Sequence, residues 1–324
     1  MSAELANDID ADMHACQRCQ SPVFHDELYC EVCGCKVSQD PEPALTAPAS
    51  VPADRETTDL GGIAGVTDRG RRRQRNEDSL AMATAGDRFI AAVCDGVAST
   101  ANPDQAAREA ATAALSVLEP LLGRAEWPAS ELEGALGRAF AEAQRAVILV
   151  PDDEPDGNDL SPSTTMVVGV VADGRVTVAN IGDSRAYWLG VSPGAARLLT
   201  VDDSWAQESI AEGVTPEVAY AHPEAHTITR WVGADADSVV PTVVTFDATE
   251  PGLLVLCTDG LWNYFEDPVA LGALVPDWVT SLPVTIARRL TDAALAAGGH
   301  DNVTVVVIPV GRAETGPGRV PTEE

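Results

Sequence analysis

The chain has 324 residues, 45% of them hydrophobic, which is long enough to bury one large core. Its formal net charge of -29 repels nucleic-acid backbones and anionic membrane surfaces, which excludes both as general partners. No apolar run approaches the roughly 20 residues that span a bilayer, and the acidic start lacks a signal-peptide pattern, so we expect a cytoplasmic protein.

A group of cysteines near the amino end has the spacing of a metal site. Two Cys-x-x-Cys pairs, Cys16/Cys19 and Cys30/Cys33, are separated by ten residues. Four thiolates at this spacing fit a tetrahedral zinc site. Residues 13–38 therefore resemble a zinc ribbon that binds one Zn²⁺. Such a segment is either a docking or regulatory module, or a knob that zinc stabilises and that has no partner.

The next segment changes composition. Residues 39–60 are rich in proline, alanine, aspartate, glutamate and threonine and show no periodicity, which predicts an extended linker. Residues 61–311 form the main domain that we expect. The last residues, 312–324, are rich in proline, glycine and glutamate and are expected to be a disordered tail.

An arginine-rich stretch opens the main domain. Five arginines stand between Arg69 and Arg75, followed by Asp78. Three interpretations are open: a solvated loop, a nucleic-acid patch, or a phosphate clamp held beside carboxylates. A guanidinium matches phosphate oxygens in a forked geometry, and the neighbouring Asp78 favours the clamp.

Acidic residues stand at the ends of several predicted strands. The apolar run from Phe89 ends in Asp95-Gly96, the run from Leu253 ends in Asp259-Gly260, and the strand 175–181 leads to Asp183. Asp301 precedes a further strand, 303–308. Carboxylates that converge from several strand ends predict one metal site, and such hard oxygen ligands favour Mg²⁺ or Mn²⁺ over zinc.

Other patterns predict the surrounding elements. Apolar periodicity predicts helices over 102–122, 130–150 and 285–297, the first two with capping signals at their starts. Asp173-Gly174 between two apolar runs predicts a hairpin. The polar residues 202–226 have the pattern of an inserted flap that is helical in parts.

Together these features resemble the metal-dependent type 2C protein phosphatases (PPM family). Seven motifs occur in the family's order: Arg73–Ser79, Val93–Gly96, Ser163–Thr165, Gly182–Tyr187, Thr227–Gly233, Leu254–Trp262 and Asp301–Val307. The resemblance implies an α+β fold, a four-layer αββα sandwich of two antiparallel sheets flanked by helices. It also implies hydrolysis of phosphoserine and phosphothreonine by a metal-activated water at a binuclear Mg²⁺ or Mn²⁺ centre.

The resemblance assigns roles to particular residues. Asp95 would bridge two ions, and Arg73 would bind the phosphate. The other implied metal ligands are Asp78, the Gly96 carbonyl, Asp259 and Asp301, with Asp183 holding a third, weaker ion. Glu77 and Asn302 would lie next to these ligands.

The chain also departs from the family pattern. Val97 cannot donate a proton, so a side-chain general acid is absent at that point, and Asp203 stands where a histidine is common. A catalytically weak or silent scaffold that acts through its ribbon is therefore the alternative to an active phosphatase. For the active enzyme we expect a monomer whose partners are phosphorylated proteins, including a serine/threonine kinase or its substrates.

Overall fold

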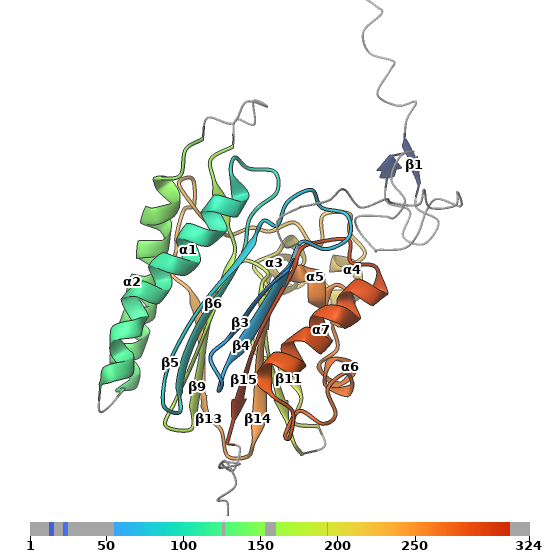
Figure 1. Cartoon of the computed structure of the whole chain (residues 1–324). Helices are drawn as coiled ribbons and strands as arrows, with labels where there is room; N and C mark the ends of the chain where they lie inside the picture. Colours follow the sequence, from blue (N-terminus) through green and yellow to red (C-terminus); the bar gives the residue numbers. More distant parts are fainter. Residues whose placement is uncertain are drawn as a thin grey trace, which may run out of the picture.

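The structure, a computed structural model, describes residues 13–15, 22–24, 55–124, 127–152, 160–192 and 194–311. Two antiparallel sheets pack face to face at its centre (Figure 1). The six-stranded sheet has the order β11-β10-β14-β15-β4-β3, with β3 (Arg55–Asp59), β4 (Ala64–Asp68), β10 (Arg185–Gly190), β11 (Arg197–Leu198), β14 (Gly252–Cys257) and β15 (Val303–Val310). The five-stranded sheet has the order β13-β9-β8-β6-β5, with β5 (Asp78–Ala85), β6 (Arg88–Asp95), β8 (Met166–Ala172), β9 (Arg175–Ile181) and β13 (Thr242–Asp247).

Helices cover the outer face of each sheet (Figure 1). Helices α1 (Pro103–Leu118) and α2 (Ala129–Ile148) lie against the five-stranded sheet, and the 3-10 helix η1 (Glu119–Gly123) follows α1. The six-stranded sheet is covered by α5 (Asp259–Trp262), α6 (Pro268–Ala273) and α7 (Pro283–Ala297). This arrangement confirms the expected α+β fold of antiparallel sheets and helices.

Three hydrophobic clusters separate the four layers, because both faces of each sheet are buried. In β6, Ile90 and Ala92 face the cluster under α1 and α2, whereas Ala91 and Val93 face the cluster between the sheets. The third cluster lies between the six-stranded sheet and α5 to α7. Successive strand residues point to opposite faces, so a strand buried on both sides must be apolar throughout. This explains the uninterrupted apolar runs in the sequence.

The sequence placed several local features correctly. The β8–β9 hairpin turns at Asp173 (φ 53°) and Gly174 (φ 76°), and positive φ at both central residues defines the turn that Asp-Gly favours. Asn102 is the N-terminal cap residue of α1, but its side chain donates to the Pro151 carbonyl instead of capping the helix.

Three boundaries differ from the predictions. Strand β3 lies in the segment predicted as linker, because Arg55 to Asp59 pair with β4 and extend the sheet. Helix α1 ends at Leu118, and the chain continues as η1, which has proline in its first turn. Helix α2 begins at Ala129 after Pro128, and the predicted capping box is not formed.

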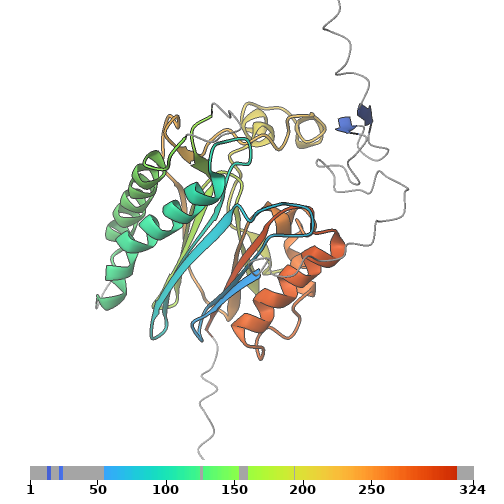
Figure 2. The same ribbon diagram turned by 45° about the horizontal axis from the view of Figure 1, so that its top comes forward.

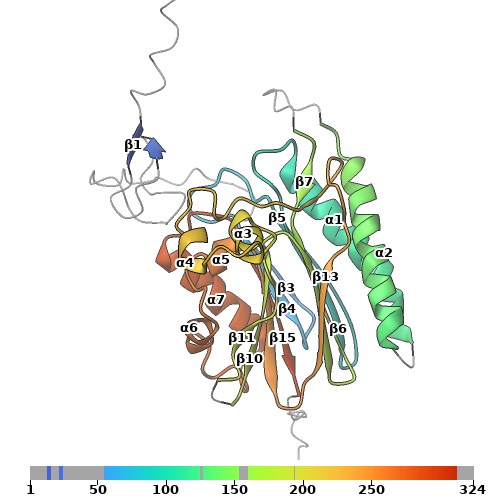
Figure 3. The same cartoon turned by 180° about the vertical axis from the view of Figure 1, so that it is seen from behind.

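A flap closes one end of the two sheets (Figures 2 and 3). It contains α3 (Trp205–Ala211) and α4 (Pro216–Ala219), which share a small apolar cluster. The flap chain returns to β12 (Val232–Gly233), which pairs with β7 (Ser163–Thr164). Helices α3 and α4 thus confirm the prediction that residues 202–226 form an inserted flap that is helical in parts.

Strands β1 (Met13–Ala15) and β2 (Pro22–Phe24) form a separate antiparallel pair. The predicted zinc ligands Cys16, Cys19, Cys30 and Cys33 lie outside the described residues, as do the rest of the predicted linker before Arg55 and the tail after Gly311. Within the part of the chain that the structure describes, no helix is long and apolar enough to cross a membrane.

Candidate metal centre

The strand pair β5–β6 brings the first two acids together. Its register places Asp78 directly opposite Asp95, so both side chains project from the same face at the end of the ladder. Asp78 is buried, and the Thr258 hydroxyl donates to its Oδ2 at 2.8 Å. Its Oδ1 is also buried and has no hydrogen-bond partner among the described residues. One carboxylate oxygen is therefore held in place and the other is left to bind something else.

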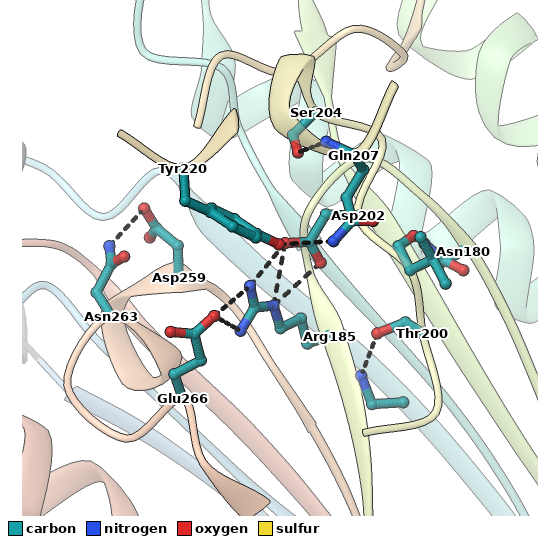
Figure 4. A network of polar contacts seen from close by, with 12 residues as sticks. Asn180, Arg185, Thr200, Asp202, Ser204, Gln207, Tyr220, Asp259, Asn263 and Glu266 are labelled. Atoms are coloured by element: carbon teal, nitrogen blue, oxygen red, sulfur yellow. Dashed lines mark hydrogen bonds and ion pairs between the residues drawn. The ribbon is translucent and has the colours of Figure 1, made fainter. Parts of the chain in front are cut away.

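The start of α5 supplies the third acid. Asp259 follows Thr258 at the end of β14, and Asn263 donates to its Oδ2 at 3.2 Å (Figure 4). Its Oδ1 is buried without a partner within the described ranges. A Cβ at Gly260 would lie 1.9 Å from the Asn302 carbonyl oxygen, so only glycine lets α5 begin this close to β15.

Asp301 is paired with the predicted phosphate-binding arginine. Arg73 Nε donates to Asp301 Oδ1 at 2.7 Å and Arg73 Nη2 donates to Oδ2 at 2.6 Å. This forked pair joins the arginine-rich loop to the residue before β15. The structure thus brings both predicted site residues to one place, with each bound to the other.

Asn302 organises the arginine-rich loop. Its side chain is buried; its Oδ1 accepts from the Glu77 N–H at 2.7 Å, and its Nδ2 donates to the carbonyls of Arg69 (2.8 Å) and Arg75 (3.0 Å). Three bonds from one amide fix the loop that carries Arg73. The family resemblance implied that Asn302 lies next to the metal ligands. It did not indicate that Asn302 holds the arginine-rich loop, because only the fold brings residues 69–77 against β15.

Gly96 lies where a side chain cannot fit. Its N–H donates to the Glu77 carbonyl at 3.1 Å, and a Cβ would lie 2.3 Å from the Pro103 carbonyl oxygen. The preceding Asp95 carbonyl accepts from the Thr164 hydroxyl and from the Thr165 N–H, each at 2.8 Å. Hydrogen bonds to Glu77, Thr164 and Thr165 therefore hold the end of β6 in place.

Asp183 occupies the turn between β9 and β10. Gly182 has φ 93°, and a Cβ there would lie 2.7 Å from the Thr165 side chain. The Ser184 hydroxyl is 2.7 Å from that of Thr165, whose Oγ1 also accepts from the Asp95 N–H at 3.2 Å. Threonine 165 thus links the Asp183 turn to the end of β6, a contact that the sequence did not indicate.

A buried arginine, Arg185, follows this turn directly in the chain, and Figure 4 shows it between Asp202 and Glu266. Arg185 donates from Nε to Asp202 Oδ1 (3.0 Å) and from Nη2 to Asp202 Oδ2 (2.7 Å). Its guanidinium also lies over the Trp262 ring, 3.8 Å from the centroid, and donates to Glu266 at 3.3 Å. Arg185 therefore connects the Asp183 turn, the start of the flap and α5, and reasoning from the sequence did not single it out.

The acids repel one another electrostatically. Burial, followed by the charges of Asp78, Asp259, Asp301 and Asp183, raises the pKa of Asp95 well above its ordinary value. Burial is also the main reason that the pKa of Asp259 is raised strongly and that those of Asp78 and Asp183 rise to about 7. Burial and like charges thus disfavour ionisation of four neighbouring carboxyl groups, whereas Asp301 has Arg73 as its partner.

The donors fit hard divalent cations. The site offers carboxylate and carbonyl oxygens, and two carboxylate oxygens, on Asp78 and Asp259, are buried without a hydrogen bond to any described residue. These are the ligands that Mg²⁺ and Mn²⁺ prefer, and their mutual repulsion would be relieved by a cation. As they stand, the described histidine, cysteine and acidic side chains form no group of three that could hold a metal ion, and both oxygens of Asp301 are engaged by Arg73.

Comparison with known proteins decides the family. A family model described as protein phosphatase 2C matches residues 67–296. The chain belongs to the protein phosphatase 2C family. The matched residues include Arg73, Asp95 and Asp259, whereas Asp301 lies just beyond them.

Two phosphatase 2C relatives show how far the similarity extends. The chain is 34% identical over 249 residues to the serine/threonine protein phosphatase PstP of Mycobacterium tuberculosis, which covers 76% of this chain and 44% of that protein. It therefore spans less than half the length of this relative. It is 31% identical over 252 residues to the serine/threonine phosphatase stp of Listeria welshimeri, covering 75% of this chain and 93% of that protein.

A solved phosphatase 2C structure is also similar. It is the catalytic domain of the serine/threonine protein phosphatase PstP in complex with two manganese ions, 30% identical with a TM-score of 0.56. The similarity covers 79% of this chain and 99% of that domain. The phosphatase 2C family thus accounts for the domain that carries the five acids.

Proposed function

We propose that this phosphatase 2C domain hydrolyses phosphoserine and phosphothreonine in proteins at a centre of two Mg²⁺ or Mn²⁺ ions. The observation that supports the proposal most strongly is the gathering of five mutually repelling carboxylates, two of them with a buried, unpartnered oxygen among the described residues. Membership of the phosphatase 2C family and the manganese in the related catalytic domain point the same way.

The ions would be held by residues from both sheets. Asp95 would bridge them, with the Gly96 carbonyl, Asp78, Asp259 and Asp301 as the remaining protein ligands and Asp183 available for a third, weaker ion. Two such ions supply Lewis-acid stabilisation of the phosphoryl oxygens and activate a water for attack on phosphorus. Glu77 and Asn302 would keep this set in place through the backbone contacts of β5 and β15.

Arg73 would bind the substrate phosphate. Its guanidinium already forms a two-bonded fork with the Asp301 carboxylate, and a phosphate presents the same oxygen spacing. As a metal ligand, Asp301 would no longer offer both of these oxygens to the guanidinium. Arg73 would then turn its fork to the phosphate, while its neighbours stay anchored by Asn302.

The first test is cation-dependent hydrolysis of a phosphothreonine peptide. Wild-type protein should release phosphate with Mn²⁺ and should bind Mn²⁺ by calorimetry, whereas Asp95→Asn should lose both. Asp87→Asn is the matched control, because Asp87 is exposed at the opposite end of the β5–β6 hairpin. A wild type that binds Mn²⁺ tightly and releases no phosphate, or an Asp95→Asn variant with full activity, would contradict the proposal. A wild type that does neither would favour the silent scaffold.

For the amino-terminal segment, we propose that Cys16, Cys19, Cys30 and Cys33 bind one Zn²⁺ and that the segment docks a phosphorylated protein, such as a kinase or its substrate. The antiparallel pairing of β1 with β2 on either side of the first cysteine pair supports a compact ribbon. Metal analysis of the purified chain should find about one zinc per molecule. Cys16→Ser should release it without changing hydrolysis of a short peptide, and zinc content equal to that of wild type in this variant would refute the assignment.

A further inference from the structure

The arginine-rich loop holds more positive charge than phosphate binding by Arg73 requires. Three of its arginines have internal partners. Arg73 binds Asp301, Arg69 donates to the Arg73 carbonyl, and Arg75 Nε donates to Glu77 at 2.9 Å. These contacts shape the loop, and Arg72 has an interaction of its own, which leaves the role of Arg71 to be explained.

Arg71 lies exposed beside the centre. Its N–H donates to the Gly299 carbonyl at 2.7 Å, and its Cγ lies 3.1 Å from where a Cβ of Gly299 would stand. Gly299 belongs to the turn that leads through His300 to Asp301. The Arg71 side chain forms no hydrogen bond or ion pair with the described residues, so its charge faces solvent next to the proposed metal ligand.

Arg72 lies along the same edge. In the turn that Arg71 contacts, the His300 N–H donates to the Tyr264 hydroxyl at 3.2 Å. Arg71 donates to the Gly299 carbonyl and Arg73 binds Asp301, so the run from Arg71 to Arg73 lies along the turn from Gly299 to Asp301, and we call these three arginines the cationic wall.

This wall is an exception in a chain with 50 acidic and 21 basic residues. An anionic substrate is repelled by most of the surface and attracted at the wall. Since Arg73 would take the phosphate that is hydrolysed, the charge of Arg71 is available to a second anionic group nearby. On the basis of the proposed phosphatase function, we propose that Arg71, flanked by Arg72, is a subsite for an anionic group next to the phosphorylated residue of the substrate.

The subsite predicts a preference among peptides that differ only beside the phosphothreonine. Three peptides are compared, with alanines, with glutamates, or with a second phosphothreonine within two residues of the first. Wild-type protein should have a kcat/KM about two- to five-fold higher for an anionic neighbour than for alanine, the range of an exposed charge pair. The advantage should act through KM and disappear in about 0.5 M salt, where charges are screened.

Arg71→Gln should remove this advantage and leave kcat/KM for the alanine peptide and for p-nitrophenyl phosphate unchanged. Arg288→Gln is the matched control: it removes the same charge from an exposed arginine in the first half of α7, whereas Arg71 adjoins the turn after that helix. Comparison of the glutamate peptide with the bisphosphorylated peptide shows whether the subsite prefers a carboxylate or a phosphate. Equal kcat/KM values for all three peptides in the wild type, or an equal loss of the anionic preference in both variants, would overturn the subsite. Hydrolysis of p-nitrophenyl phosphate in the same experiment would still support the phosphatase function.

Discussion

Replacing Asn302 with alanine should destabilise the protein and loosen the arginine-rich loop together. The substitution removes three hydrogen bonds of a buried side chain, one from the Glu77 N–H and two to the carbonyls of Arg69 and Arg75. At about 1 kcal/mol for each bond, the free energy of unfolding should fall by about 3 kcal/mol. Because Arg73 depends on this loop for its position, KM for a phosphothreonine peptide should rise.

Urea unfolding of the metal-free protein measures the first effect, and steady-state kinetics with Mn²⁺ measures the second. Asn263→Ala is the matched control, because Asn263 is exposed and its side chain makes one hydrogen bond among the described residues, to Asp259 at 3.2 Å. That variant should lose less than about 0.5 kcal/mol. An Asn302→Ala variant as stable as the control, with an unchanged KM, would refute the idea that this amide holds the loop.

Further predictions concern the buried charges and a glycine. Arg185→Met should lower the free energy of unfolding in urea by about 3–5 kcal/mol, because it leaves Asp202 buried without its partner. Adding Asp202→Leu should recover most of this loss, and strictly additive losses would be contrary evidence. Burial raises the pKa of Asp78 to about 7, while an unfolded aspartate titrates at about 4, so the wild-type protein in EDTA should lose stability as the pH rises from about 4 to about 7. Asp78→Asn should reduce this dependence of unfolding free energy on pH, and an unchanged slope would argue against it. Gly96→Ala should lower Mn²⁺ affinity and cost about 1–3 kcal/mol, whereas Gly137→Ala, in an open position on α2, should not destabilise; similar effects of the two would exclude the close contact with Pro103.

The sequence was most informative where one residue type has one physical use. Apolar runs ending in Asp95-Gly96 and Asp259-Gly260 located two strand ends of the site, because a strand buried on both faces must be apolar until it reaches an edge. Asp173-Gly174 fixed a hairpin for a similar reason. The resemblance to a family then supplied the four-layer arrangement, which no local pattern encodes.

The supporting contacts could not be predicted in the same way. Thr258 and Asn302 bind groups more than 170 positions away in the chain, and a polar residue in a strand end carries no mark of such a partner. Arg55 to Asp59 lack an apolar pattern because β3 is an edge strand, so the sequence placed them in the linker. The pairing of Arg73 with Asp301 also depends on tertiary structure alone.

The central claim is that the gathered aspartates bind divalent cations that activate the protein. Calorimetric titration of Mn²⁺ into the metal-free chain, with phosphate release from a phosphothreonine peptide measured over the same concentrations, tests it most directly. The account predicts about two ions bound per molecule, activity that rises with their binding, and loss of both in Asp95→Asn but not in Asp87→Asn. Phosphate release that is independent of added cation, or unchanged Mn²⁺ binding in Asp95→Asn, would contradict it.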